Sequence, residues 1–115
     1  MAISEFEVKR YEKLMDKFMA KHRPPVHIRN EVDLGYKITN QSIEIFEIRP
    51  QWDNPLKKTK MPVAKSTYVK NQKIWKVYWQ RADQKWHSYA PLPTVKMLEE
   101  FLDAVGEDQH ACFFG

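Results

Sequence analysis

The sequence has a single cysteine, Cys112, and only three glycines in 115 residues. One cysteine cannot form a disulfide within the chain, so we expect no dependence on an oxidising compartment. Three glycines are also too few for the common nucleotide-binding fingerprints, which need a glycine-rich loop around the phosphate groups. These scarcities exclude a disulfide-stabilised fold and the usual nucleotide-binding loops.

Long hydrophobic runs are also missing. No segment approaches the roughly 20 apolar residues of a membrane-spanning helix, and the N-terminal MAISEFEVKR lacks the apolar run behind a basic start that marks a signal peptide. The hydrophobic fraction of 43% and the aromatic fraction of 13% nevertheless argue against disorder. We therefore expect a single domain over residues 1–115, located in the cytoplasm and with no membrane association.

Acidic residues are scarce in residues 57–85, which contain nine lysines or arginines and only Asp83, for a net charge of +8. Residues 1–56 are neutral overall, and residues 86–115 have a net charge of −4. The positive charge therefore belongs to one segment, and clustered charge generates a stronger field than scattered charge. This segment overlaps residues 74–89, IWKVYWQRADQKWHSY, which hold three of the four tryptophans.

A first helix is predicted near the N-terminus. Ser4 and Glu7 fit a capping box, and the helix that they begin is predicted to end near His22, because Pro24 and Pro25 cannot donate backbone hydrogen bonds. Apolar residues at helical spacing predict its buried stripe. They are Phe6, Tyr11, Leu14, Met15 and Phe18.

A second helix is predicted after Pro91 and Pro93, which interrupt the preceding strands. Thr94 is its expected N-cap, and Gly106 stands where a left-handed C-terminal cap is expected. The residues predicted to form its inner face are Val95, Leu98, Phe101, Leu102 and Val105.

Alternating apolar and polar residues predict the strands between the helices. They cover residues 32–38, 43–49, 63–69 and 74–80, followed by a turn at 82–85 and a short return strand. In the fourth strand, Trp75, Val77 and Trp79 point to the core, and Ile74, Lys76, Tyr78 and Gln80 to the half-exposed face. The prediction is an α+β fold, in which an antiparallel sheet of four or five strands has both helices covering one face.

Residues 50–62 are predicted to form one long irregular loop, of the kind that is often functional or mobile. Trp52, flanked by polar residues in this loop, is a candidate contact for a partner. Phe113 and Phe114 near the C-terminus are expected to dock on the sheet or on a partner, since exposed they would promote aggregation.

The basic segment combines lysines with aromatic residues, which is typical of surfaces that bind nucleic acid. Lysines neutralise phosphates, and rings stack on unpaired bases. The residues expected to converge on one such face are Lys57, Lys58, Lys60, Lys65, Tyr68, Lys70, Lys73, Lys76, Tyr78, Arg81 and Lys85. Alternatively, the lysines protect a sheet edge from aggregation and the rings only pack.

Three smaller combinations have structural explanations beside functional ones. Glu47 and Arg49 on one strand face suggest a salt bridge. Asp83 and His87 are the first half of a general-base arrangement, but no nucleophile with a supporting motif accompanies them, and Asp83 fits a turn. A hydrolase using Asp83, His87 or Glu47 would need a pocket that holds two of these side chains.

A metal site is not predicted. His110 and Cys112 are both ligand types, but a closed zinc site needs four ligands, usually as two spaced pairs. The remaining histidines lack that spacing, and Cys112 between Ala111 and Phe113 fits a small buried hydrophobe. We therefore expect no metal, no cofactor and no enzymatic activity.

Several segments resemble a bacterial family, the proteins grouped as domain of unknown function 3024. They are RPP (23–25), QSIEIFEIRPQW (41–52), PVAK (62–65), TYVK (67–70), WKVYWQRADQKWHSY (75–89) and ACFFG (111–115). The resemblance covers nearly the whole chain, in order. It implies a small, complete, stand-alone cytoplasmic protein, and it assigns no catalytic residue because the family has no established activity.

The sequence therefore predicts a non-enzymatic binding module with RNA or DNA on its basic, aromatic sheet face. A protein-interaction module, either a homodimer or an accessory factor for an acidic partner, is the alternative, and light scattering would distinguish the two.

Overall fold

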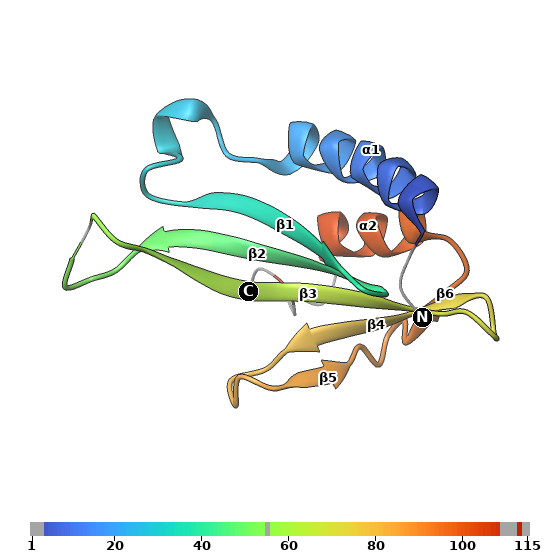
Figure 1. The fold of residues 1–115 in the computed structure, drawn as a ribbon. Coiled ribbons are helices and arrows are strands. Elements are labelled where there is room, and N and C mark those ends of the chain that lie inside the picture. Colours follow the sequence, from blue (N-terminus) through green and yellow to red (C-terminus); the bar gives the residue numbers. More distant parts are fainter. Residues whose placement is uncertain (1–3, 55, 109–112, 114–115) are drawn as a thin grey trace.

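The computed structural model describes residues 4–54, 56–108 and 113. In sequence, the described chain runs from an N-terminal helix through six strands to a C-terminal helix, and the strands form one antiparallel sheet (Figure 1). In chain order the elements are α1 (Glu5–His22), the 3₁₀ helix η1 (Val26–Ile28), β1 (Asp33–Thr39), β2 (Ser42–Pro50), β3 (Lys58–Val69), β4 (Ile74–Gln80), β5 (Trp86–Ser88), β6 (Thr94–Val95) and α2 (Leu98–Glu107). The strands follow the order β1-β2-β3-β4-β5, and β6 also pairs with β4.

Both helices cover the same face of the sheet, as predicted (Figure 1). Their buried residues form one core with the strand residues on that face. The contributors are Tyr11, Met15 and Phe18 from α1, Leu98, Phe101, Leu102 and Val105 from α2, and Ile43, Ile45, Trp75 and Val77 from the strands. The α+β prediction is thereby confirmed, and so is the inward direction of Trp75 and Val77.

The capping box begins α1 as predicted. The Ser4 hydroxyl accepts the backbone N–H of Glu7 at 3.3 Å and donates to the Glu7 carboxylate at 2.9 Å. The prediction for Phe6 is wrong, because its side chain is 89% exposed. An α-helix turns by about 100° per residue, so Phe6, nine residues before Met15, lies on the opposite side of the helix.

Strand β3 begins at Lys58, which shortens the predicted 50–62 loop to residues 51–57. Pro62 had suggested a loop, but residues 58–62 of β3 pair with β2 alone, since β4 pairs only from Ala64 onward. A proline is tolerated there because its missing N–H removes no bond to a second neighbour, and a register shift lies beside it at Ile45/Phe46. Beyond Ile48, where pairing with β1 ends, residues 49–50 of β2 and 58–59 of β3 extend past the sheet as a two-stranded ribbon, with the 51–57 loop at its tip (Figure 1).

The start of α2 also differs from the prediction. Thr94 is not an N-cap, because Thr94 and Val95 form β6 opposite Lys76 and Trp75 of β4. Pairing with β4 holds these two residues extended, so the helix begins three residues later, at Leu98. Val95 is buried as expected, but it reaches the core from a strand.

Gly106 lies inside α2 and is not the left-handed cap. Asp108, with φ of 44°, has that conformation. A glycine is needed at position 106 because the His22 ring lies against its Cα, and a Cβ there would be 2.7 Å from His22 Nε2. The constraint comes from packing between α1 and α2.

His22 gives a testable pH dependence. Its ring packs on Phe18, with 4.5 Å between ring centroids, and burial together with the charge of Lys21 lowers its pKa. The unfolded chain then binds a proton more readily than the folded one, so the stability from His22 is present above about pH 6.5 and is lost as pH falls. We expect H22F, which keeps a ring, to show a weaker loss of unfolding free energy between about pH 7.5 and 5.5, measured by urea denaturation.

The exposed His27 provides the control, and H27Q should keep the wild-type pH slope. Other charges near His22 are Lys17, Lys21, Glu99 and Asp103 on one side and Glu47 and Arg49 on the other. An H22F slope equal to that of wild type would contradict the assignment.

Candidate nucleic-acid interface

The sheet face away from the helices carries lysines among aromatic rings. Strand register aligns Lys37, Glu44, Lys65 and Tyr78 in one row across β1 to β4. Neither described helix lies on this side (Figure 1). We define the open face by these four residues together with Phe46, Lys60, Lys76 and Trp86.

Lys65 lies at the centre of the open face, between two rings. Its Nζ is 5.2 Å from the Tyr78 ring centroid and 5.0 Å from that of Trp86. Lys60 Nζ similarly lies 5.0 Å from the centroid of Phe46. Such contacts stabilise exposed sites by about 0.5–1 kcal/mol each, so the lysines are held over the rings but are not locked there.

The open face has more cations than acids. Lys37 lies 3.8 Å from Glu44, a surface pair that contributes about 0–1 kcal/mol. Among the described residues, Lys60, Lys65 and Lys76 form no ion pair with a carboxylate. The excess charge on this face is therefore available to an anionic ligand.

Phe46 is packed flat on the open face by a glycine opposite it. A Cβ on Gly35 would lie 2.6 Å from Cε2 of the Phe46 ring, so only glycine leaves room for the ring on β1. The ring is buried beneath Lys60. Phe46 thus supports the lysine and does not itself present a free stacking surface.

Four of the eleven predicted binding residues share the open face: Lys60, Lys65, Lys76 and Tyr78. The expectation that Tyr68 joins Tyr78 is wrong, because Tyr68 pairs opposite Trp75 and packs on it at 5.1 Å between ring centroids. Register explains this, since Lys65 is opposite Tyr78. From Ala64 onward, past the register shift, odd-numbered residues of β3 therefore share the face of even-numbered residues of β4.

The other predicted cations lie around the rim. Lys70 and Lys73 are in the β3–β4 turn, and Arg81 and Lys85 are in the β4–β5 turn, with the Arg81 guanidinium 5.6 Å from the Trp79 ring centroid. The remaining two, Lys57 and Lys58, belong to the ribbon. The nine basic residues therefore form a central group with a rim, and not one plate.

Sequence reasoning missed Lys37, Phe46 and Trp86. Lys37 follows the alternation of its strand, so extending that pattern across the register would have found it. Phe46 follows a bulge, and Trp86 lies in a strand of only three residues. Neither position has a usable alternation signal.

The smaller predicted pairs are structural. Asp83 accepts the N–H of Lys85 at 2.9 Å and bonds His87 Nε2 at 2.9 Å, and these two contacts, in that order, lower the pKa of Asp83. Asp83 thus holds the exposed turn, as its simpler interpretation predicted. Glu47 and Arg49 form the expected ion pair at 3.1 Å.

Phe113 packs inside the molecule, with 4.7 Å between its ring centroid and that of Tyr89. Of the two predicted alternatives, docking on the chain or on a partner, the structure shows Phe113 docked on the chain, with 6% of its surface exposed. Phe114, His110 and Cys112 lie outside the described residues. Within the described ranges, no group of three or more His, Cys, Asp or Glu residues is placed to hold a metal ion.

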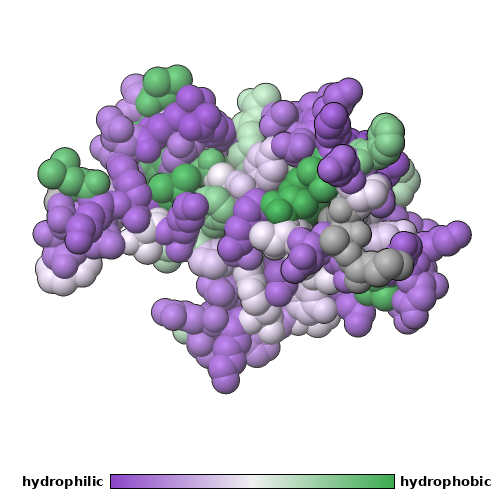
Figure 2. All heavy atoms as spheres, viewed as in Figure 1, coloured by the Kyte–Doolittle hydropathy of each residue, from purple (hydrophilic) through white to green (hydrophobic). Residues whose placement is uncertain are grey.

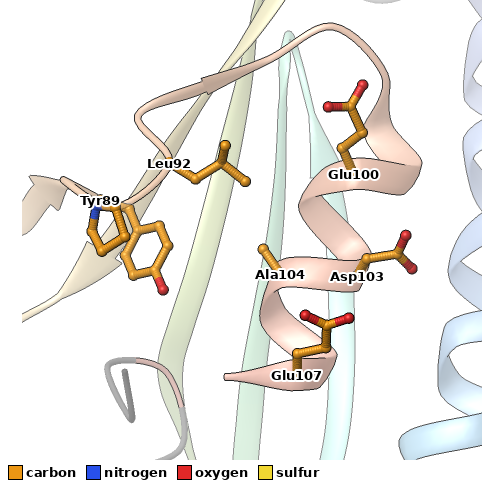
Figure 3. A pocket seen from close by; sticks show the side chains of 7 residues that line it. Tyr89, Leu92, Glu100, Asp103, Ala104 and Glu107 are labelled. Carbon is orange, nitrogen blue, oxygen red and sulfur yellow. The ribbon is translucent and has the colours of Figure 1, made fainter. Parts of the chain in front are cut away.

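A cavity of about 360 Å³ lies in the helix layer, beside α2. Figure 3 shows Glu100 and Glu107 on the α2 side of this cavity and Tyr89 and Leu92 on the other. Its acidic lining would repel a phosphate, so this cavity does not fit an anionic ligand. Neither described helix is apolar enough over sufficient length to cross a membrane.

Comparison with known families gives one match. The family model described as "Domain of unknown function (DUF3024)" matches residues 3–115, which confirms the resemblance noted in the sequence. No curated protein and no solved structure matches the chain.

Proposed function

Because the chain belongs to the DUF3024 family, whose function is unknown, we propose from its geometry that it is a non-enzymatic module that binds single-stranded nucleic acid. The open face is the proposed binding surface. The observation that carries the proposal is the position of Lys65, between Tyr78 and Trp86 in the middle of a sheet face with no helix over it in the described chain.

Each component of this arrangement has a role toward a nucleic-acid strand. Lysines attract phosphates and release their counterions, which supplies affinity without regard to sequence. The half-buried rings of Tyr78 and Trp86 offer surfaces on which bases stack, an interaction of about 1–3 kcal/mol per base. Lys65 would move from the rings to a phosphate when a base takes its place.

Unpaired bases fit this surface better than a duplex does. Stacking on a protein ring requires a base that is not already between two neighbours in a helix, which is why sheet platforms of this kind bind single strands. A duplex would meet the lysines through its phosphates alone and leave the rings unused. We therefore expect single strands to bind more tightly than duplexes of equal length.

Fluorescence anisotropy with labelled oligonucleotides tests the proposal. We expect the association constant for single-stranded RNA or DNA to fall with salt, with a log–log slope of about −2 to −3, because three or four lysines each contribute about 0.7. An abasic strand of the same length and charge is the matched control for stacking, and it should bind at least tenfold more weakly.

Absence of binding to every RNA and DNA form at low salt would end the proposal. Equal binding of the abasic strand would show that the lysines bind the strand but that the rings of Tyr78 and Trp86 do not stack on its bases. Light scattering on the same samples shows whether the chain is a dimer, and a dimer that loses nucleic-acid binding as it forms would favour burial of the open face.

A further inference from the structure

We infer that the strand bound on the open face continues along the β2–β3 ribbon, and that Trp52 at its tip stacks on one of the bases. The inference rests on the function proposed above and specifies the ligand as an extended single strand with a minimum length. It begins with an exposed aromatic side chain that the open face does not explain.

Trp52 and Leu56 are 95% and 93% exposed, although both are large and apolar. They lie in the loop that joins β2 to β3, at the tip of the ribbon. Figure 2 shows hydrophobic surface at this projecting end, surrounded by hydrophilic residues. A single exposed leucine is ordinary, but an indole with almost its whole surface in water offers a ready stacking partner.

The tip is held in place by its own hydrogen bonds. The N–H of Gln51 donates to Lys57 O at 2.9 Å, and the N–H of Lys57 donates to Asn54 O at 3.0 Å. The Asn54 side chain also accepts the N–H of Leu56 at 3.2 Å. Trp52 is therefore presented by a bonded loop, which reduces the conformational entropy lost when a ligand binds.

The ribbon is also tied to the rest of the molecule. Lys58 Nζ donates to the carbonyl oxygen of Asn30 at 2.9 Å, which joins the base of the ribbon to the segment after η1. It adds one side-chain contact to the β2–β3 pairing that connects the tip with the open face.

Charge and register continue the open face onto the ribbon. Pairing of Phe46 with Pro62, Ile48 with Lys60 and Pro50 with Lys58 keeps one side of the ribbon in line with the open face. Lys58 and Lys60 lie on that side, whereas Glu47 and Arg49 alternate to the other side, where they pair with each other. An anionic chain leaving Lys65 therefore meets further cations on its way to Trp52.

The length of β3 sets the expected ligand size. Seven residue steps of strand separate Lys65 from Lys58 on the ribbon, about 23 Å at about 3.3 Å per residue, which a stacked strand rising about 3.4 Å per nucleotide spans with roughly seven nucleotides. A stacked strand of four nucleotides, about 14 Å long, is too short to reach from Lys65 to the ribbon tip. Affinity is therefore expected to rise with oligonucleotide length and to level off near this value.

Titration of W52A with thymidine oligonucleotides of 4 and 15 nucleotides tests the inference. We expect W52A to bind the 15-mer about 5- to 100-fold more weakly than the wild-type chain does, and the 4-mer equally well. W52F, which retains a ring, should recover most of the loss, and L56A, which removes a neighbouring exposed apolar group, should bind as wild type. Because Trp52 is exposed, W52A should keep the wild-type melting temperature.

Wild-type affinity of W52A for the 15-mer would overturn the inference while leaving the open-face proposal intact. If the wild-type chain binds neither oligonucleotide, the proposed function fails and the inference falls with it. Co-sedimentation with vesicles of phosphatidylcholine and phosphatidylserine tests whether Trp52 instead binds an anionic membrane surface. Vesicle binding that requires Trp52, with no Trp52 effect on oligonucleotides, would assign the tip to an anionic membrane surface and overturn the inference.

Discussion

Replacement of Phe101 by alanine is expected to lower the free energy of unfolding by about 3–5 kcal/mol. The Phe101 side chain has no exposed surface and belongs to the core between α2, α1 and the sheet. Its removal loses the transfer free energy of the ring and leaves a cavity that neighbours on several elements cannot fill by relaxing. Since small domains have about 5–15 kcal/mol in total, F101A approaches the limit of a folded chain. Urea denaturation measures the change.

Phe6 provides a matched control of the same residue type. It is 89% exposed on the outer side of α1, so F6A should change the free energy of unfolding by less than about 0.5 kcal/mol. Similar losses in F6A and F101A would show that the described core is wrong. If F101A does not fold at all, F101L is the milder variant. Its free energy of unfolding should be lower than those of wild type and F6A but large enough for the chain to fold.

Reversal of two charges at the centre of the open face should have the largest effect on binding. We expect K65E/K76E to reduce the affinity for a single-stranded 15-mer by about 100-fold or more at low salt, because two phosphate contacts are lost and two repulsions are added. The substitution also removes the contacts of Lys65 with the rings of Tyr78 and Trp86. The melting temperature of the double variant must therefore be measured together with its affinity.

The control for this pair lies on the other side of the molecule. Lys9 and Lys13 are exposed on α1, and K9E/K13E makes the same change in net charge. It should reduce affinity by no more than about threefold, through the long-range field alone, which salt screens. Equal losses in the two double variants would mean that net charge, and not the open face, determines binding.

The local signals in the sequence predicted the elements well. A side-chain hydroxyl and a carboxylate three residues apart begin α1, and two prolines lie within three residues after its end. Strand alternation likewise placed Trp75 and Val77 in the core, because the two faces of a strand differ in every second residue. Such features depend on neighbours in the chain, and those neighbours are visible in the sequence.

The misplaced residues depend on partners outside their own helix or strand. Thr94 became part of a strand because β4 pairs with it, and residue 106 is a glycine because His22 lies against it. Tyr68 faces the core because the β3–β4 register places it opposite Trp75. A pattern read within one helix or one strand does not identify these partners.

The sequence by itself determined the fold class, the family and the presence of a basic, aromatic segment. Only the tertiary structure decided which of those cations share a face with rings, because strand register and the turn positions distribute one charged segment over a central group, a rim and a ribbon. Composition counts charges along a chain, but a ligand meets only those that the pairing of distant strands turns toward the same side.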